Sequence, residues 1–267
     1  MARVMDSPFV LPFLAGLPLA VALALLGNLL RLREEWLATL GLTHLAAATA
    51  LAGVGLGLPA VWGAPMGAML GATGKYLSRQ RSNEVYAVMI LGGWSLMLLI
   101  AANSALGHAL AQAMVDGQLY FAGSREAGMA LLVLLLVFLL LPWLTPRLIR
   151  ARLLPSYERA NRLPAWRWHL GFDLMVAFAV AVATATLGLM ATFALVFIPP
   201  WIAHRHATSW KQAMLSSAAI AAAMYLIAFW LALRLDQPYG PVLVALLVLA
   251  LLPMHLIRPP HASQAKA

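Results

Sequence analysis

The sequence contains no cysteine, which excludes disulfides, thiolate metal sites and cysteine nucleophiles. It is also poor in charge, because charged residues make up only 10% of its 267 residues, against 63% hydrophobic residues. A soluble domain cannot bury that much apolar surface, so the composition indicates an all-α, polytopic membrane protein. The phosphate-binding pattern G-x-x-x-x-G-K-[ST] is missing too, so we expect no ATP or other cofactor on this chain.

Acidic residues are scarce as well, with nine Asp and Glu against eighteen Lys and Arg, which gives a formal charge of +9. In a chain this apolar, the excess indicates cytoplasmic loops beside anionic lipid and no role in nucleic-acid binding. Fifteen of the eighteen basic residues lie in residues 31–35, 75–81, 147–167, 205–211 and 258–267. If all these segments are cytoplasmic, each apolar stretch between them crosses the membrane an even number of times.

This parity predicts nine transmembrane helices, with eight as the alternative, an outside N-terminus and a cytoplasmic C-terminus. Residues 9–30 cross once, and hairpins follow at 36–74, 83–146, 174–203 and 212–256. Because 174–203 is too long for one simple crossing, we expect two short helices that turn near Thr186–Gly188. The other turns are predicted near 59–65, 103–127 and 236–240. Residues 1–258 then form a single transmembrane domain, 259–267 form a short cytoplasmic tail, and no cleaved signal is expected.

Small residues indicate where these helices pack closely. Gly63, Gly67 and Gly71 recur every four residues and predict a smooth helix face for close approach. The alanine-rich run 218–223 predicts the same. Composition bias is the alternative explanation, and the strict spacing of the glycines argues against it.

Three motifs, taken in their order and spacing, resemble those of a known family. They are Asp116–Glu126 (DGQLYFAGSRE), Leu187–Ala203 (LGLMATFALVFIPPWIA) with Gly188, Ile198, Pro199 and Ala203, and Leu235–Pro241 (LDQPYGP) with Asp236, Pro238, Gly240 and Pro241. Over nearly its full length, the chain resembles the permease subunit of bacterial zinc/manganese-type ABC importers. The resemblance implies a multi-pass permease homodimer in the bacterial inner membrane, separate ATPase subunits that bind ATP, and a periplasmic solute-binding protein. The implied cargo is zinc, manganese or iron, with the metal-binding residues unknown.

In that family a short coupling helix follows the I-P signature and docks on the ATPase, and here this role falls on Pro200–Thr208. Pro199 and Pro200 are expected to end or kink the preceding span, because proline lacks an N–H and clashes with the preceding turn. The polar end of the segment then needs water or lipid headgroups. An ordinary basic loop is the alternative. The candidate coupling residues are Pro199, Pro200, Trp201, Ile202, Ala203, His204, Arg205 and His206.

Ionisable residues inside spans are costly and often functional, so His44 is a candidate for the substrate path. Glu84 and Asp173 are its candidate partners, since a zinc site needs three or four ligands. Each can equally serve as a helix-capping or hydrogen-bonding group. On the outer side, Asp116 joins His108, Glu126 and Asp236 in a possible acidic mouth, although Asp236 also suits turn chemistry.

The chain departs from the family where the path is expected. Ala48 takes the position of a family histidine in the second span, and Gly92 takes that of another in the fourth. No nucleophile with a base and no paired carboxylates on one helix face were found, so we expect no enzyme. The alternatives are an ion-coupled secondary transporter, or an intramembrane enzyme that uses His44 and Asp173.

Overall fold

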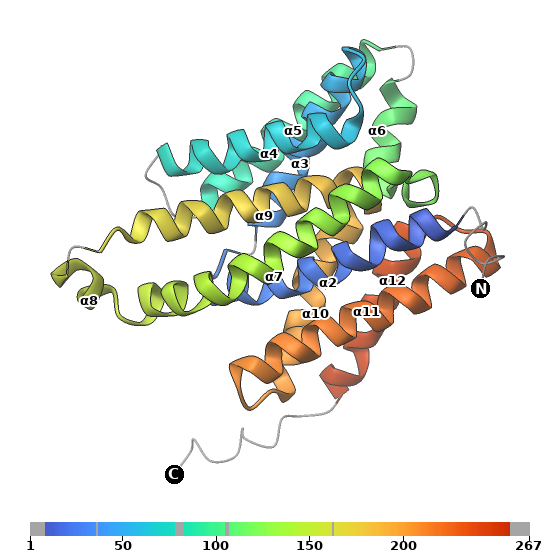
Figure 1. Ribbon diagram of the computed structural model, residues 1–267. Helices are drawn as coiled ribbons and strands as arrows, with labels where there is room; N and C mark the ends of the chain where they lie inside the picture. Colours follow the sequence, from blue (N-terminus) through green and yellow to red (C-terminus); the bar gives the residue numbers. More distant parts are fainter. Residues whose placement is uncertain (1–8, 36, 78–82, 105–106, 162, 257–267) are drawn as a thin grey trace.

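The computed structural model describes residues 9–35, 37–77, 83–104, 107–161 and 163–256. Within these ranges the chain is helical and contains no strand (Figure 1). Nine helices have 18 residues or more: α2 (Val10–Arg33), α3 (Ala38–Gly55), α4 (Ala60–Leu77), α5 (Asn83–Ala102), α7 (Ser124–Leu153), α9 (Ala165–Leu187), α10 (Leu189–His206), α11 (Trp210–Leu235) and α12 (Tyr239–Leu256). Three short elements complete this part: α6 (Gly107–Asp116), the 3₁₀ turn η1 (Leu119–Phe121) and α8 (Pro155–Ala160).

Six of the described helices, α2, α3, α5, α7, α9 and α11, are long and apolar enough to cross a membrane. The chain is thus an all-helical, polytopic membrane protein, and the count of nine spans and the orientation of the termini stay predictions. Two of the predicted turns are confirmed as helix boundaries: α9 ends at Leu187, next to Gly188, and α11 ends at Leu235, next to Asp236. The turn predicted near 59–65 lies earlier, because α3 ends at Gly55 and α4 begins at Ala60 and continues through Pro65. The first of the two helices expected to be short is also longer than predicted, since α9 begins at Ala165 and has 23 residues. The predicted tail, 259–267, and the basic residues Arg79, Arg81, Arg162 and Arg258 lie outside the described residues.

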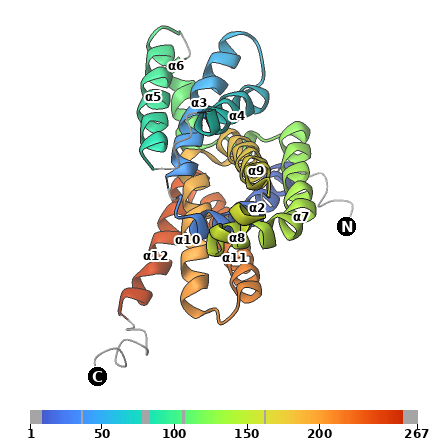
Figure 2. The same ribbon diagram turned by 90° about the vertical axis from the view of Figure 1, so that its left-hand side faces the viewer.

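The long helices run back and forth between two ends of a bundle. In Figure 1 the basic ends of α2, α4, α7 and α10 point to the left or lower left, and α6, η1 and the α11–α12 turn lie on the right. Both Figure 1 and Figure 2 place α3, α4 and α5 on one side, α10, α11 and α12 on the other, and α2, α7 and α9 between them. Most of the described basic residues therefore gather at one end, whereas Arg125 at the start of α7 and Arg234 at the end of α11 lie at the other.

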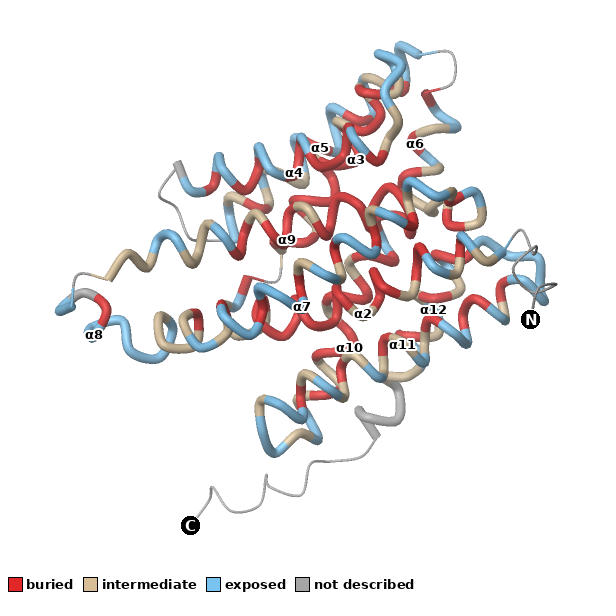
Figure 3. The backbone as a smooth tube through the Cα atoms, viewed as in Figure 1, coloured by how far each residue is buried: buried red, intermediate tan, exposed pale blue. Residues whose placement is uncertain are grey.

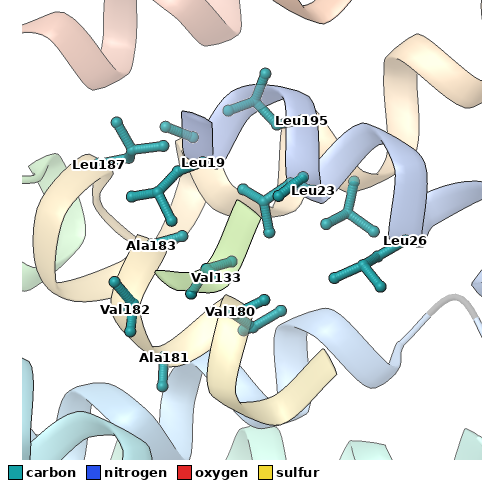
Figure 4. Packing of buried hydrophobic residues seen from close by; sticks show 14 of the residues in the cluster. Leu19, Leu23, Leu26, Val133, Val180, Ala181, Val182, Ala183, Leu187 and Leu195 are labelled. Carbon is teal, nitrogen blue, oxygen red and sulfur yellow. The ribbon is translucent and has the colours of Figure 1, made fainter. Parts of the chain in front are cut away.

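Burial separates central from peripheral helices. The apolar windows of α2 and α9 are 67% and 78% buried, whereas those of α5, α7 and α11 are at most 33% buried (Figure 3). Figure 4 shows Leu19, Leu23 and Leu26 of α2 among small apolar side chains of α9. The exposed leucines of the peripheral helices suit contact with lipid tails, which are as apolar as leucine itself.

The glycine repeat on α4 packs against α3, as predicted. A Cβ on Gly67 would lie 2.2 Å from Thr49 Oγ1 and 2.5 Å from the Leu45 carbonyl oxygen. A Cβ on Gly63 would lie 2.9 Å from the Thr49 carbonyl oxygen. The two backbones can approach this closely only because glycine has no side chain.

Candidate functional site

The predicted coupling segment forms the last turns of α10. Of the two outcomes expected for Pro199 and Pro200, an end or a kink of the span, the end is wrong, because α10 continues through both prolines to His206. Pro200 has no N–H, so the Val196 carbonyl loses its usual helical donor. That carbonyl lies against Gly27 of α2, where a Cβ would lie 2.0 Å from its oxygen. At the prolines, α10 is therefore packed closely against α2.

Beyond the prolines the segment becomes progressively exposed. Ala203 is buried, Trp201, Ile202 and His204 are half-buried, and Arg205 and His206 are exposed. The His204 ring packs 5.7 Å from the Trp210 ring of α11, measured between centroids. The segment is therefore no separate helix: it ends at His206 and turns directly into α11.

Side chains close the turn between α10 and α11. Ser209 Oγ accepts a hydrogen bond from the Gln212 N–H at 3.2 Å and caps α11. In return, the Gln212 side-chain oxygen accepts from the Thr208 N–H at 3.0 Å and from the Thr208 hydroxyl at 2.9 Å. This reciprocal capping satisfies donors at the helix start. The result is a well-defined, polar hairpin tip at the basic end of the bundle.

A shallow cavity lies between α10 and the ends of α2 and α3. Glu35 and Pro200 both line it, so the connector after α2 lies beside the segment predicted to couple to the ATPase. The complete lining is Gly27, Leu30, Arg31, Glu35, Thr39, Phe193, Val196, Phe197 and Pro200.

Next to this cavity, four charged side chains form a closed ring at the basic end. Arg33 contacts Glu35 Oε1 at 2.9 Å and Asp173 Oδ1 at 2.7 Å. Lys75 contacts the other oxygen of each carboxylate, Glu35 Oε2 at 2.9 Å and Asp173 Oδ2 at 3.2 Å. The hydroxyl of Tyr86 donates to Glu35 Oε2 at 3.0 Å. We call Arg33, Glu35, Lys75 and Asp173 the charge ring; it joins α2 and its connector to α4 and α9, and Tyr86 adds α5.

The charge ring is nearly excluded from solvent, with side chains between 5% and 11% exposed. Arg33 lies over the Phe172 ring at 5.1 Å and Lys75 over the Tyr86 ring at 5.0 Å. Burial alone would raise the pKa of the Glu35 carboxyl, but Arg33 and Lys75 outweigh it and hold that pKa below its ordinary value. The buried charges thus balance, because the ring contains two cations and two carboxylates.

The predicted substrate-path residues do not gather into one ligand group. Asp173 belongs to the charge ring, and Glu84 lies in the first turn of α5. His44 is buried in α3, where Nδ1 lies 2.7 Å from the Leu40 carbonyl oxygen and the ring lies 5.7 Å from that of Trp94. Within the described ranges, no three His, Asp or Glu residues are grouped so that they could hold a metal ion. A role for each residue in the substrate path stays a prediction.

At the opposite end, the three sequence motifs meet in a backbone crossing of Gly117, Gly188 and Gly240. Gly188, with φ +91°, lies where a Cβ would be 2.5 Å from the Gly117 nitrogen. A Cβ on Gly240 would lie 2.4 Å from the Asp116 carbonyl oxygen. The Gln118 N–H also donates to the Thr186 carbonyl at 3.0 Å. The three motifs lie far apart in the sequence, and the structure packs them against one another.

The acidic residues predicted for the outer mouth have structural partners. The Asp116 carboxylate accepts a hydrogen bond from Gln112 at 2.7 Å. Glu126 accepts from the Gly123 N–H at 2.8 Å and caps α7. Asp236 adopts a left-handed conformation, φ 51°, at the end of α11, ahead of Pro238, Gly240 and Pro241, which agrees with turn chemistry.

Comparisons with known proteins agree with this architecture. A family model described as "ABC 3 transport family" matches residues 7–258. No curated protein matches the chain. Among solved structures, PsaBC from Streptococcus pneumoniae in complex with a Fab is similar, with a TM-score of 0.79, 14% sequence identity, and coverage of 93% of this chain and 91% of that one. A solved structure described as "an inward-facing conformation of a putative metal-chelate type ABC transporter" gives a TM-score of 0.74 at 14% identity, with coverage of 92% of this chain and 85% of that one.

Proposed function

The chain belongs to the ABC 3 transport family, and on this premise we propose that it is the permease subunit of an ABC importer for a divalent metal ion. It is a membrane-embedded transport component, not an enzyme. The proposed cargo is zinc, manganese or iron. The proposed location is the bacterial inner membrane, with nine spans and the basic end in the cytoplasm.

The observation that carries this proposal is the capped α10–α11 tip. It presents exposed Arg205 and His206 at the end of the bundle where the basic residues gather. We propose that a separate ATPase subunit docks on Trp201–His206. Binding of ATP to that subunit would then move α10. A second permease copy and a periplasmic binding protein complete the proposed assembly, with the binding protein at the end that holds the glycine crossing.

A chelated metal is the second candidate cargo. The solved metal-chelate-type transporter has a similar fold. In this chain, the His44 ring already contacts the Leu40 carbonyl and Trp94, and Asp173 is held by two cations. These contacts favour a metal ion that is already bound by a chelator over a free ion that needs both His44 and Asp173 as ligands.

The cargo test is uptake into proteoliposomes that hold the permease and its ATPase, with the binding protein added. We expect ATP-dependent uptake of a divalent metal, measured separately for the free ions and for their chelates. Uptake of the chelate alone selects the second candidate. ATP hydrolysis without metal uptake in either form contradicts both.

Docking of the ATPase is tested by placing a negative charge in the α10–α11 tip. We expect Ile202→Glu and His206→Glu to leave membrane insertion intact and to abolish copurification of the ATPase. Ser104→Glu, at an exposed position at the other end, is the matched control and should retain the ATPase. Full ATPase content in both tip variants would show that the subunit docks elsewhere.

A further inference from the structure

We propose that the charge ring is the joint through which movement of α10 reaches α4, α5 and α9 during transport. This rests on the proposed function, because it takes the end of α10 as the place where the ATPase acts. Arg33, Glu35, Lys75 and Asp173 are then positioning residues, which transmit movement and do not touch cargo.

The arrangement of helices gives such a joint a place. α10 lies on one side of the bundle, α4 and α5 lie on the other, and α2 lies between them (Figures 1 and 2). α10 is packed tightly on α2, since the Val196 carbonyl lies against Gly27. A displacement of α10 at the prolines therefore acts on α2, as it also acts on α3 and α9, which α10 contacts directly.

The charge ring then connects α2 to the far side. Arg33 is the last residue of α2, and Glu35 follows in the connector and lines the cavity with Pro200. Through the two carboxylates, this end is bound to Lys75 of α4 and to Asp173 of α9. The hydrogen bond from Tyr86 to Glu35 adds the start of α5.

The chemistry of the ring makes this connection stiff. Each carboxylate binds one cation with each oxygen, so the departure of one member leaves its two neighbours to share a single partner and leaves one uncompensated charge in a nearly water-free site. Apolar packing between helices can slide, whereas separating a desolvated ion pair is costly because the Coulomb attraction is strong at low dielectric. Buried ion pairs are in general weak contributors to net stability. A role in holding geometry fits the ring better than a role in stability alone.

The test removes one cation and one carboxylate together, so that the ring stays neutral. Lys75→Met with Asp173→Asn leaves the Arg33–Glu35 pair and the Tyr86 hydrogen bond in place, but it cuts α4 and α9 from the end of α2. In proteoliposomes with the ATPase and binding protein, we expect normal ATPase content, continued ATP hydrolysis, and a fall of about tenfold in metal transported per ATP.

Two further double variants sharpen the result. Glu35→Gln with Lys75→Met keeps the Arg33–Asp173 pair, and so keeps α2 tied to α9; it should lose less coupling. Glu34→Gln with Arg152→Gln removes a neighbouring ion pair whose side chains are 68% and 44% exposed, and it should transport as the wild type does. A ring that matters only for folding would change protein yield and not the ratio of metal to ATP.

The outcomes separate the two proposals. A wild-type complex that transports no metal or chelate refutes the proposed function. A wild-type complex that transports, beside a Lys75→Met/Asp173→Asn complex with the same metal-to-ATP ratio, overturns the joint. Failure of both ring variants to assemble with the ATPase assigns the ring to folding, and this also overturns the joint.

Discussion

Substitution of Gly188 by alanine tests the glycine crossing most directly. Its backbone, with φ +91° and ψ +163°, lies in a region that is essentially restricted to glycine. An added Cβ would lie 2.5 Å from the Gly117 nitrogen and 2.7 Å from the Asp116 carbonyl carbon. Both are backbone atoms, so no side chain can rotate away to relieve the clash.

Two contributions set the expected size of the effect. Backbone strain at such a position costs about 1–3 kcal/mol, and overpacking a well-packed site costs about 1–3 kcal/mol more. We therefore expect Gly188→Ala to destabilise the fold by about 2–6 kcal/mol. For a chain of this size, each kcal/mol lowers the melting temperature by roughly 2–4 °C, so the drop is on the order of 10 °C.

The assay is the loss of monodisperse protein on heating in detergent, followed by size-exclusion chromatography at one fixed heating rate. Gly171→Ala is the matched control, because Gly171 lies in α9 and no heavy atom would lie within 4 Å of its Cβ. We expect this control to match the wild type or to gain up to about 1 kcal/mol from helix propensity. Equal melting of the two variants would refute the crossing as a tight backbone contact.

Three other predictions follow. The fold holds the pKa of the Glu35 carboxyl below its ordinary value of 4.5, so ionised Glu35 should stabilise the protein above pH 4.5, and this stabilisation should be lost as the pH falls below that value. The melting temperature of Glu35→Gln should therefore depend less on pH across that range than that of the wild type. Gly67→Leu should cost at least about 1–3 kcal/mol in a thermal melt, whereas Gly74→Ala, with an open site, should cost little. The chain has no native cysteine, so single cysteines can report which side of the membrane each end faces. An impermeant maleimide should label Phe121→Cys in intact spheroplasts but His206→Cys only after permeabilisation. The reverse pattern would invert the proposed orientation.

Features that depend on local sequence were predictable. Long apolar runs separated by basic residues indicate spans and their ends, and the turns at Gly188 and Asp236 have residues suited to unusual backbone angles. The glycine repeat on α4 was equally readable, because its spacing by four places all three residues on one helix face. In these cases the cause lies within a few residues of the effect.

The continuation of α10 through Pro199 and Pro200 was not predictable from those residues. Proline removes a donor wherever it stands, and the local rule is that the helix ends or kinks. What the rule omits is the partner: Gly27, far away in sequence, lets α2 approach the freed Val196 carbonyl. Local propensity therefore gives way here to a tertiary contact.

The charge ring could not be predicted for a different reason. Loop parity assigns charged residues at span ends to water, and on that basis Glu35 and Lys75 looked like ordinary loop residues. Their pairing joins positions 40 residues apart, and Lys75 and Asp173 are 98 apart. Asp173 was identified as chemically significant, but it was assigned to His44 when its partners are Arg33 and Lys75. The sequence shows that charges are few, and only the fold shows which ones meet.

The two unusual sites stand at opposite ends of the bundle, with α9 reaching both, and this limits how α10 can move. At Gly188 the contacts are backbone to backbone, so that end has no side chain to repack and can serve only as a fixed point. A rigid helix of 18 residues is about 27 Å long, so a tilt of about 10° about Gly188 displaces its His206 end by roughly 5 Å. At Val196, which contacts Gly27 of α2, the same tilt gives a displacement of roughly 2 Å, and α2 must follow it or lose the contact. If α10 tilts during transport, the charge ring must therefore travel with α2 or break, and the neutral double variants distinguish these two cases.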